Sequence, residues 1–96
     1  MTLEEKKEKM TDIVANKLWE NNIKFTSIMT HFSKDSLLRD SSIKDVLITS
    51  FTEPVFDKDI SVITDPETLE MLYVRTDVRR FMEIDDFFQP RIDDEE

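Results

Sequence analysis

Cysteine is absent from this chain of 96 residues, and its absence closes several chemical routes. Without it the chain can form no disulfide, no thiolate metal site and no cysteine nucleophile. A cysteine-free composition fits a reducing compartment, so we expect an intracellular, cytoplasmic protein.

Glycine is absent as well. Glycine-rich phosphate loops and dinucleotide-binding turns are therefore impossible. Glycine is also the usual residue where the backbone dihedral φ must be positive, as in tight hairpin turns and after helix ends. The composition thus favours helices joined by ordinary turns over a fold with many β-hairpins.

Long apolar runs are missing, and no signal-peptide core follows Met1. No segment approaches the roughly 20 apolar residues of a membrane span, so we expect no membrane partner. Apolar residues still make up 39% of the chain, which argues against complete disorder and predicts one domain with a modest core.

The net charge of −9 comes entirely from the second part of the chain. Residues 1–52 hold eight basic and eight acidic residues, whereas residues 53–96 hold five basic and fourteen acidic ones. This balance disfavours direct binding to nucleic acid and to anionic membranes, which both need clustered Lys and Arg. It favours a protein partner with a basic surface.

A first helix is predicted from Thr2 to about Asn21. Thr2 and Glu5 have the spacing of a capping box, and Asn tolerates the left-handed conformation in which helices often end. Apolar residues at helical spacing follow, namely Leu3, Met10, Ile13, Val14 and Leu18.

Two further helices are predicted from apolar residues spaced i, i+3, i+4 and i+7. The first would cover about two turns around Phe25, Ile28, Met29 and Phe32. The second would begin after Ser41 or Ser42, bury Ile43, Val46, Leu47 and Phe51, and end at Pro54.

The region after Pro54 allows two interpretations. Ile60, Val62 and Thr64 alternate as in a short strand. Asp65-Pro66 then either starts a fourth helix over residues 66–83 or forms a type I turn, after which a strand returns over residues 69–75. The cap chemistry and the missing glycine favour the helix.

The predicted fold is therefore mostly α: a small three- to four-helix domain over residues 1–82, followed by an acidic aromatic segment over residues 83–96. The alternative is an α+β fold of three helices and a β-hairpin, which would resemble a winged helix. In either case the end after Pro90 is predicted to be disordered.

Catalytic and metal-binding patterns are weak. Asp57, Asp59 and Ser61 resemble the opening of a calcium loop, but its sixth and twelfth positions are Val62 and Thr68, which do not fit. His31 is the only histidine and has no evident orienting partner in the sequence. The acidic pairs near the end are typical of solvated carboxylates. We expect no enzyme activity, no cofactor and no metal.

One small basic cluster stands out against the acidic composition. Arg75, Arg79 and Arg80 would be neighbours on a helix, where ion pairs with nearby acids are the simpler interpretation. Binding of a small anion or of nucleic acid at this cluster is the alternative.

The most specific pattern is the segment from Phe81 to Phe88. Ile84, Phe87 and Phe88 match the aliphatic and aromatic positions of the box that binds sliding clamps, and the segment resembles that box. Phe81 stands where the box has glutamine, so the likeness is incomplete. One helical turn would gather Ile84, Phe87 and Phe88 into a plug for a partner's pocket. The alternative is that Phe81, Ile84 and Phe88 cover the domain's own core.

From these patterns we expect a non-enzymatic, protein-binding regulator, either an adaptor or an inhibitor. Its type is similar to that of phage and viral proteins that take over host enzymes. It would act by phosphate mimicry, as a DNA mimic does, or by docking its aromatic plug, and its partner could be a nucleic-acid enzyme or a sliding clamp. The predicted partner-binding residues are Glu83, Ile84, Asp85, Asp86, Phe87, Phe88, Asp93 and Asp94.

The sequence also allows two other functions. The chain could be a small structural subunit of a larger assembly, in which Phe87 and Phe88 lie in a permanent interface. It could also be a winged-helix-like DNA-binding regulator. The sequence leaves homo-oligomerisation open.

Overall fold

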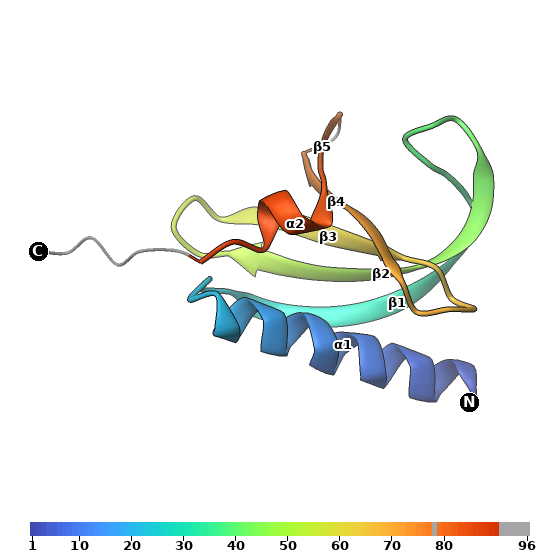
Figure 1. Ribbon diagram of the computed structural model, residues 1–96, viewed down its shortest axis with the longest axis horizontal. Coiled ribbons are helices and arrows are strands. Elements are labelled where there is room, and N and C mark those ends of the chain that lie inside the picture. Colours follow the sequence, from blue (N-terminus) through green and yellow to red (C-terminus); the bar gives the residue numbers. More distant parts are fainter. Residues whose placement is uncertain (78, 91–96) are drawn as a thin grey trace, which may run out of the picture.

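A computed structural model describes residues 1–77 and 79–90. Over these residues the chain forms a long helix, an antiparallel sheet of five strands and a one-turn helix (Figure 1). The strands follow one another in the sheet in chain order, so each pairs with the next. The elements are α1 (Leu3–Glu20), β1 (Thr26–Leu37), β2 (Ile43–Glu53), β3 (Lys58–Thr64), β4 (Met71–Asp77), β5 (Arg80–Met82) and α2 (Ile84–Phe87).

The N-terminal helix is confirmed, together with its capping box. The Thr2 hydroxyl accepts a hydrogen bond from the Glu5 backbone N–H at 3.2 Å, and the Glu5 carboxylate accepts one from the Thr2 N–H at 2.8 Å. Asn21 follows the last helical residue, and its side chain donates to the Lys17 carbonyl at 2.8 Å. The helix therefore begins and ends where local chemistry places its ends.

The mostly helical fold is wrong, because the two helices predicted over residues 25–32 and 43–51 are the strands β1 and β2. In β2 the side chains of Val46, Leu47, Ile48 and Thr49 are all buried, since both faces of the sheet are covered there. A strand buried on both faces lacks the alternation of polar and apolar residues. Its apolar residues can then match helical spacing by accident.

The predicted fourth helix is also wrong, and the turn interpretation holds instead. The Asp65 carboxylate accepts hydrogen bonds from the backbone N–H groups of Glu67 and Thr68, at 2.8 and 3.4 Å. The first of these bonds is the main reason that the pKa of Asp65 lies below its usual value. The chain then returns along β3 as β4. The α+β alternative is closer to the fold, but a winged-helix arrangement is excluded because its three helices are not present within the described residues.

The missing glycines did not prevent hairpins. Several other residues take the positive φ that turns and bulges require, namely Asn22, Ser27, Asp35, Ser41, Asp57 and Leu69. Most are Asn, Asp or Ser, whose short polar side chains tolerate this conformation better than bulky ones do. The absence of glycine predicts helices rather than β-hairpins. That prediction is wrong because these residues take the place of glycine at the turns.

Asp57, in the β2–β3 turn, gives a direct test of this substitution. Its φ is 55°, so Asp57→Val should destabilise the fold by about 1–2 kcal/mol, since a β-branched residue is strained there. The matched control is Lys58→Val, which places the same side chain one residue later, in β3. Urea unfolding followed by circular dichroism would measure both. Equal stability of the two variants would contradict a backbone origin for the effect.

The main core lies between the helices and one face of the sheet. Both helices contribute to it, since α1 supplies Met10, Val14 and Leu18, and Phe87 comes from α2. The buried strand residues of this core are Leu47, Phe51, Ile60, Val62 and Val74.

A smaller cluster lies on the opposite face of the sheet, where Ile48, Ile63 and Tyr73 are paired in register. The closed end of the β1–β2 hairpin bends away from α1 (Figure 1). Leu38, from this end, packs against the cluster. The Arg39 backbone N–H donates to the Tyr73 hydroxyl at 3.3 Å, and the Arg39 guanidinium lies 4.6 Å from the centre of its ring. The hairpin end thus covers part of the second face.

Over residues 1–77 and 79–90, neither helix combines the length and the apolar content that a membrane crossing requires.

Candidate functional site

The aromatic residues of the C-terminal segment lie inside the protein. Phe87 and Phe88 are only 4% and 8% exposed and belong to the main core. Their ring centres are 5.1 Å apart, and Phe87 lies 6.2 Å from Phe51 of β2. Lys17 of α1 places its ammonium 5.5 Å from the centre of the Phe88 ring. These rings are therefore not presented to a partner in this conformation.

The other predicted binding residues of this segment differ in their surroundings. Ile84 is half-buried against the core, whereas the Glu83 carboxylate pairs with the Arg39 guanidinium at 2.9 Å. Asp85 and Asp86 are exposed in the first turn of α2. Partner binding by these residues stays a prediction. Asp93 and Asp94 lie outside the described residues, as does the predicted disordered end.

The three arginines do not share a helix face. Arg75 lies in β4, opposite Phe81 of β5, and Arg80 lies opposite Asp77. Arg75, Arg79 and Arg80 are all exposed.

His31 is exposed on β1, opposite Ile48, and no group of three or more His, Asp or Glu residues that could hold a metal occurs within the described part of the chain.

Large apolar side chains are exposed at the end of the molecule where α1 stops. Trp19 is 66% exposed, while Val55 and Phe56, in the β2–β3 turn, are 72% and 76% exposed. Thr26, at the start of β1, pairs with Thr52, near the end of β2, so the end of α1 and this turn lie at the same end of the sheet (Figure 1). We call Trp19, Val55 and Phe56 the apolar end.

The turn that carries Val55 and Phe56 is held by Glu53. Its carboxylate accepts hydrogen bonds from the backbone N–H of Val55 at 2.7 Å and of Phe56 at 2.9 Å. The backbone that carries both apolar side chains is thus held in an ordered turn. A turn whose backbone is already ordered loses less conformational entropy when it binds.

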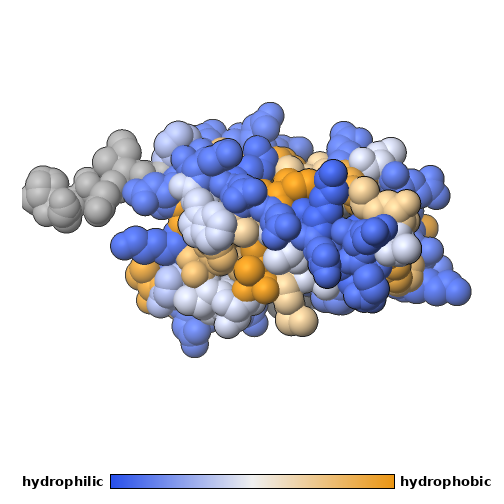
Figure 2. All heavy atoms as spheres, turned by 90° about the horizontal axis from the view of Figure 1, so that it is seen from below, coloured by the Kyte–Doolittle hydropathy of each residue, from blue (hydrophilic) through white to orange (hydrophobic). Residues whose placement is uncertain are grey.

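Trp19 is also held in place. Its ring lies 5.6 Å from Phe25, which in turn packs against Phe51 at 6.2 Å, with the two rings nearly perpendicular. This chain of aromatic contacts connects an exposed indole to the core. Figure 2, which views the molecule from the side of α1, shows that hydrophilic atoms separate the apolar patches, and one group of apolar atoms lies at the left end.

The spacing of apolar residues in the sequence does not predict this surface. A usable signal was present, because Pro54-Val55-Phe56-Asp57 places two large apolar residues next to a proline and between two strands, where polar turn residues are usual. The exposure of Trp19 could not be predicted from spacing alone. Leu18 and Trp19 are adjacent large apolar residues, yet Leu18 is fully buried and Trp19 is exposed.

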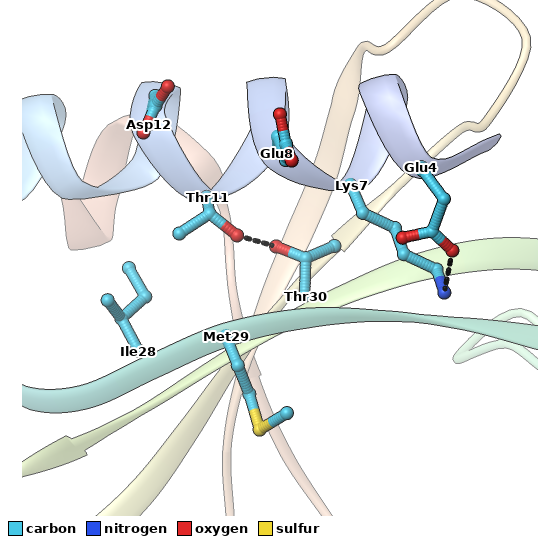
Figure 3. A pocket seen from close by; sticks show the side chains of 8 residues that line it. All are labelled: Glu4, Lys7, Glu8, Thr11, Asp12, Ile28, Met29 and Thr30. Carbon is cyan, nitrogen blue, oxygen red and sulfur yellow. Dashed lines mark hydrogen bonds and ion pairs between the residues drawn. The ribbon is translucent and has the colours of Figure 1, made fainter. Parts of the chain in front are cut away.

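A groove of about 500 Å³ runs between the N-terminal half of α1 and β1 (Figure 3). Its lining includes the acids Glu4, Glu8 and Asp12, with Lys7 as its one basic residue. Lys7 pairs with Glu4 at 3.3 Å. The groove therefore keeps two carboxylates without a basic partner within the described residues.

Hydroxyl groups connect the helix to the sheet at the floor of this groove. Thr11 of α1 and Thr30 of β1 share a hydrogen bond of 2.7 Å, and Thr30 shares another of 2.8 Å with Thr49 of β2. The contact between Thr11 and Thr30 is visible in Figure 3. It fixes the height of α1 above β1 and with it the width of the groove.

Comparisons with known proteins add nothing to this description: no protein-family model matches the chain, and no significant match was found among curated proteins or among solved structures.

Proposed function

We propose that this chain is a non-enzymatic protein-binding subunit that docks its apolar end into a hydrophobic pocket of a larger assembly. The observation that carries the proposal is the exposure of Trp19, Val55 and Phe56 on an ordered frame, while the aromatics of the acidic segment are buried. Trp and other aromatic residues supply much of the energy of protein interfaces. The absence of cysteine supports a place in the cytoplasm.

This proposal favours an assembly subunit over the regulator expected from the sequence. A regulator that docked Ile84, Phe87 and Phe88 would first have to withdraw Phe87 and Phe88 from the core. Phosphate mimicry by Asp85, Asp86 and the acids beyond Pro90 stays a prediction. The two mechanisms differ in their response to salt, because charge pairing weakens as ionic strength rises whereas burial of apolar surface does not.

The test is affinity capture from the native host with two double variants as baits. Trp19→Ala/Phe56→Ala should lose the stoichiometric partner that the unchanged chain captures. The matched control is Leu37→Ala/Ile43→Ala, which removes two side chains that are 71% and 65% exposed but paired at the opposite end of the sheet. The control should keep the partner.

Capture should also persist at high salt. A partner lost equally from both variants, or lost from the unchanged chain at high salt, would contradict docking through the apolar end. Circular dichroism should show that both variants remain folded, since the residues changed lie on the surface.

A further inference from the structure

We propose that the groove between α1 and β1 binds a short extended peptide of alternating basic and apolar residues, which adds as a sixth strand to the sheet. This inference rests on the proposed protein-binding function but uses a surface different from the apolar end. Four features of the groove carry it: a free strand edge, a limited regular length, an acidic row and an exposed methionine.

The free edge belongs to β1. It is an outer strand of the sheet, and β2 is its one strand neighbour over residues 1–77 and 79–90. The outer edge of such a strand presents backbone N–H and C=O groups that an added strand can pair with. The groove lies along this strand, since Ile28, Met29 and Thr30 form its β1 side (Figure 3).

The regular part of the edge is short. The pairing with β2 is unbroken from Met29 to Ser33, and register shifts interrupt it on both sides. Ser27 and Asp35, with φ of 56° and 54°, lie at these irregularities. Bulges of this kind twist an edge and limit what can pair with it. The edge therefore suits a peptide of about five residues.

The acidic row indicates the charge of the peptide. Glu8 and Asp12 are exposed, lie one turn apart on α1, and form no ion pair within the described residues. Their separation along the helix axis is about 6 Å. Side chains two residues apart in a strand are about 6.7 Å apart and point the same way. Two basic residues at positions i and i+2 of the peptide would match Glu8 and Asp12.

The other face of the added strand meets different chemistry. Figure 3 shows Ile28 and Thr30 pointing from β1 towards α1, and Met29 pointing to the opposite side. Met29 is 61% exposed. An adaptable thioether side chain of this kind suits an apolar neighbour. Residues of the peptide between the basic ones would thus be apolar.

A second copy of the chain fits this edge less well. Two β1 edges related by a two-fold axis perpendicular to the sheet would place both α1 helices on the same face. The unpaired carboxylates of Glu8 and Asp12 from both copies would then approach each other. Like charges across such a contact are destabilising, so the edge favours a basic peptide.

The test measures fluorescence anisotropy of a labelled Lys-Val-Lys-Val-Lys peptide with the full chain at low salt. Two peptide controls separate backbone pairing from charge alone. One carries the same residues with the three lysines contiguous, and the other has the parent sequence with an N-methyl group on every peptide-bond nitrogen. We expect both controls to bind about tenfold more weakly or worse, since each loses alternation or backbone donors.

The protein variants complete the test. Glu8→Lys/Asp12→Lys should weaken binding of the parent peptide about tenfold or more, because two attractive contacts become repulsive. The matched control is Glu67→Lys/Glu70→Lys, which makes the same change in net charge on exposed residues of the β3–β4 turn and should bind nearly as the unchanged chain does.

Equal affinity for the parent and N-methylated peptides would overturn strand addition. Equal weakening by both charge variants would overturn the groove as the site. Trp19→Ala/Phe56→Ala should leave peptide affinity unchanged, so that failure of docking through the apolar end and failure of peptide binding are seen separately.

Discussion

Phe87→Ala is expected to destabilise the fold by about 3–5 kcal/mol, the usual cost of truncating a buried phenylalanine. Phe87 is 4% exposed and contacts the rings of Phe51 and Phe88, at 6.2 and 5.1 Å between centres. Its removal would open a cavity where α2 meets β2, and the surrounding strands can relax only in part. Urea unfolding followed by tryptophan fluorescence and circular dichroism would measure the loss.

The control is Phe81→Ala in the same acidic aromatic region. Phe81 is more exposed and contacts Tyr73, with 5.3 Å between ring centres, so its truncation should cost no more than about 1 kcal/mol. If Phe87→Ala were as stable as the unchanged chain, Phe87 would not be a core residue. The predicted docking of Ile84, Phe87 and Phe88 into a partner would then regain its basis.

Thr30→Val is expected to cost about 1–3 kcal/mol, because it leaves the buried hydroxyl of Thr49 without its partner. Thr30 shares hydrogen bonds with Thr11 and Thr49, and Thr49 is completely buried. Valine has nearly the shape of threonine and suits a strand, so the loss would come from the hydroxyl network and not from packing. Urea unfolding would give the free energy.

Two further valine variants make this test specific. Adding Thr49→Val to Thr30→Val should recover part of the loss, since the buried unpaired hydroxyl is then gone. Thr64→Val alone should raise stability by about 1 kcal/mol, because the Thr64 hydroxyl is buried with no hydrogen-bond partner within the described residues. Two results would contradict this account. One is a double variant that loses more unfolding free energy than its two single variants together, and the other is a loss of stability in Thr64→Val.

The errors in the predicted fold come from particular residues. The apolar spacing of Ile43, Val46, Leu47 and Phe51 fits a helix, yet Leu47 and Phe51 belong to the main core on one face of β2 and Val46 to the smaller cluster on the other. Spacing cannot separate a buried helix from a strand covered on both sides. At Asp65-Pro66 the same residues serve equally well to start a helix or to form a turn.

The candidate surfaces show the same limit. The acidic aromatic segment was predicted to bind a partner because its large apolar side chains stand among carboxylates. Only the packing of α2 against Phe51 and α1 shows that Phe87 and Phe88 are buried. The groove was beyond reach because Thr11 and Thr30, which join its two walls, belong to elements that the sequence did not pair.

The sequence by itself determined the features that depend on composition or on neighbours a few residues apart. It excluded cysteine chemistry and glycine loops, located the whole net charge in residues 53–96, and placed α1 through the contact of Thr2 with Glu5. The tertiary structure alone decided that β1 and β2 are strands, that Phe87 is buried and that Phe56 is exposed. The physical reason is range: a helix cap is completed within one turn, whereas a strand is fixed by partners such as Thr26 and Thr52, which lie far apart in the chain.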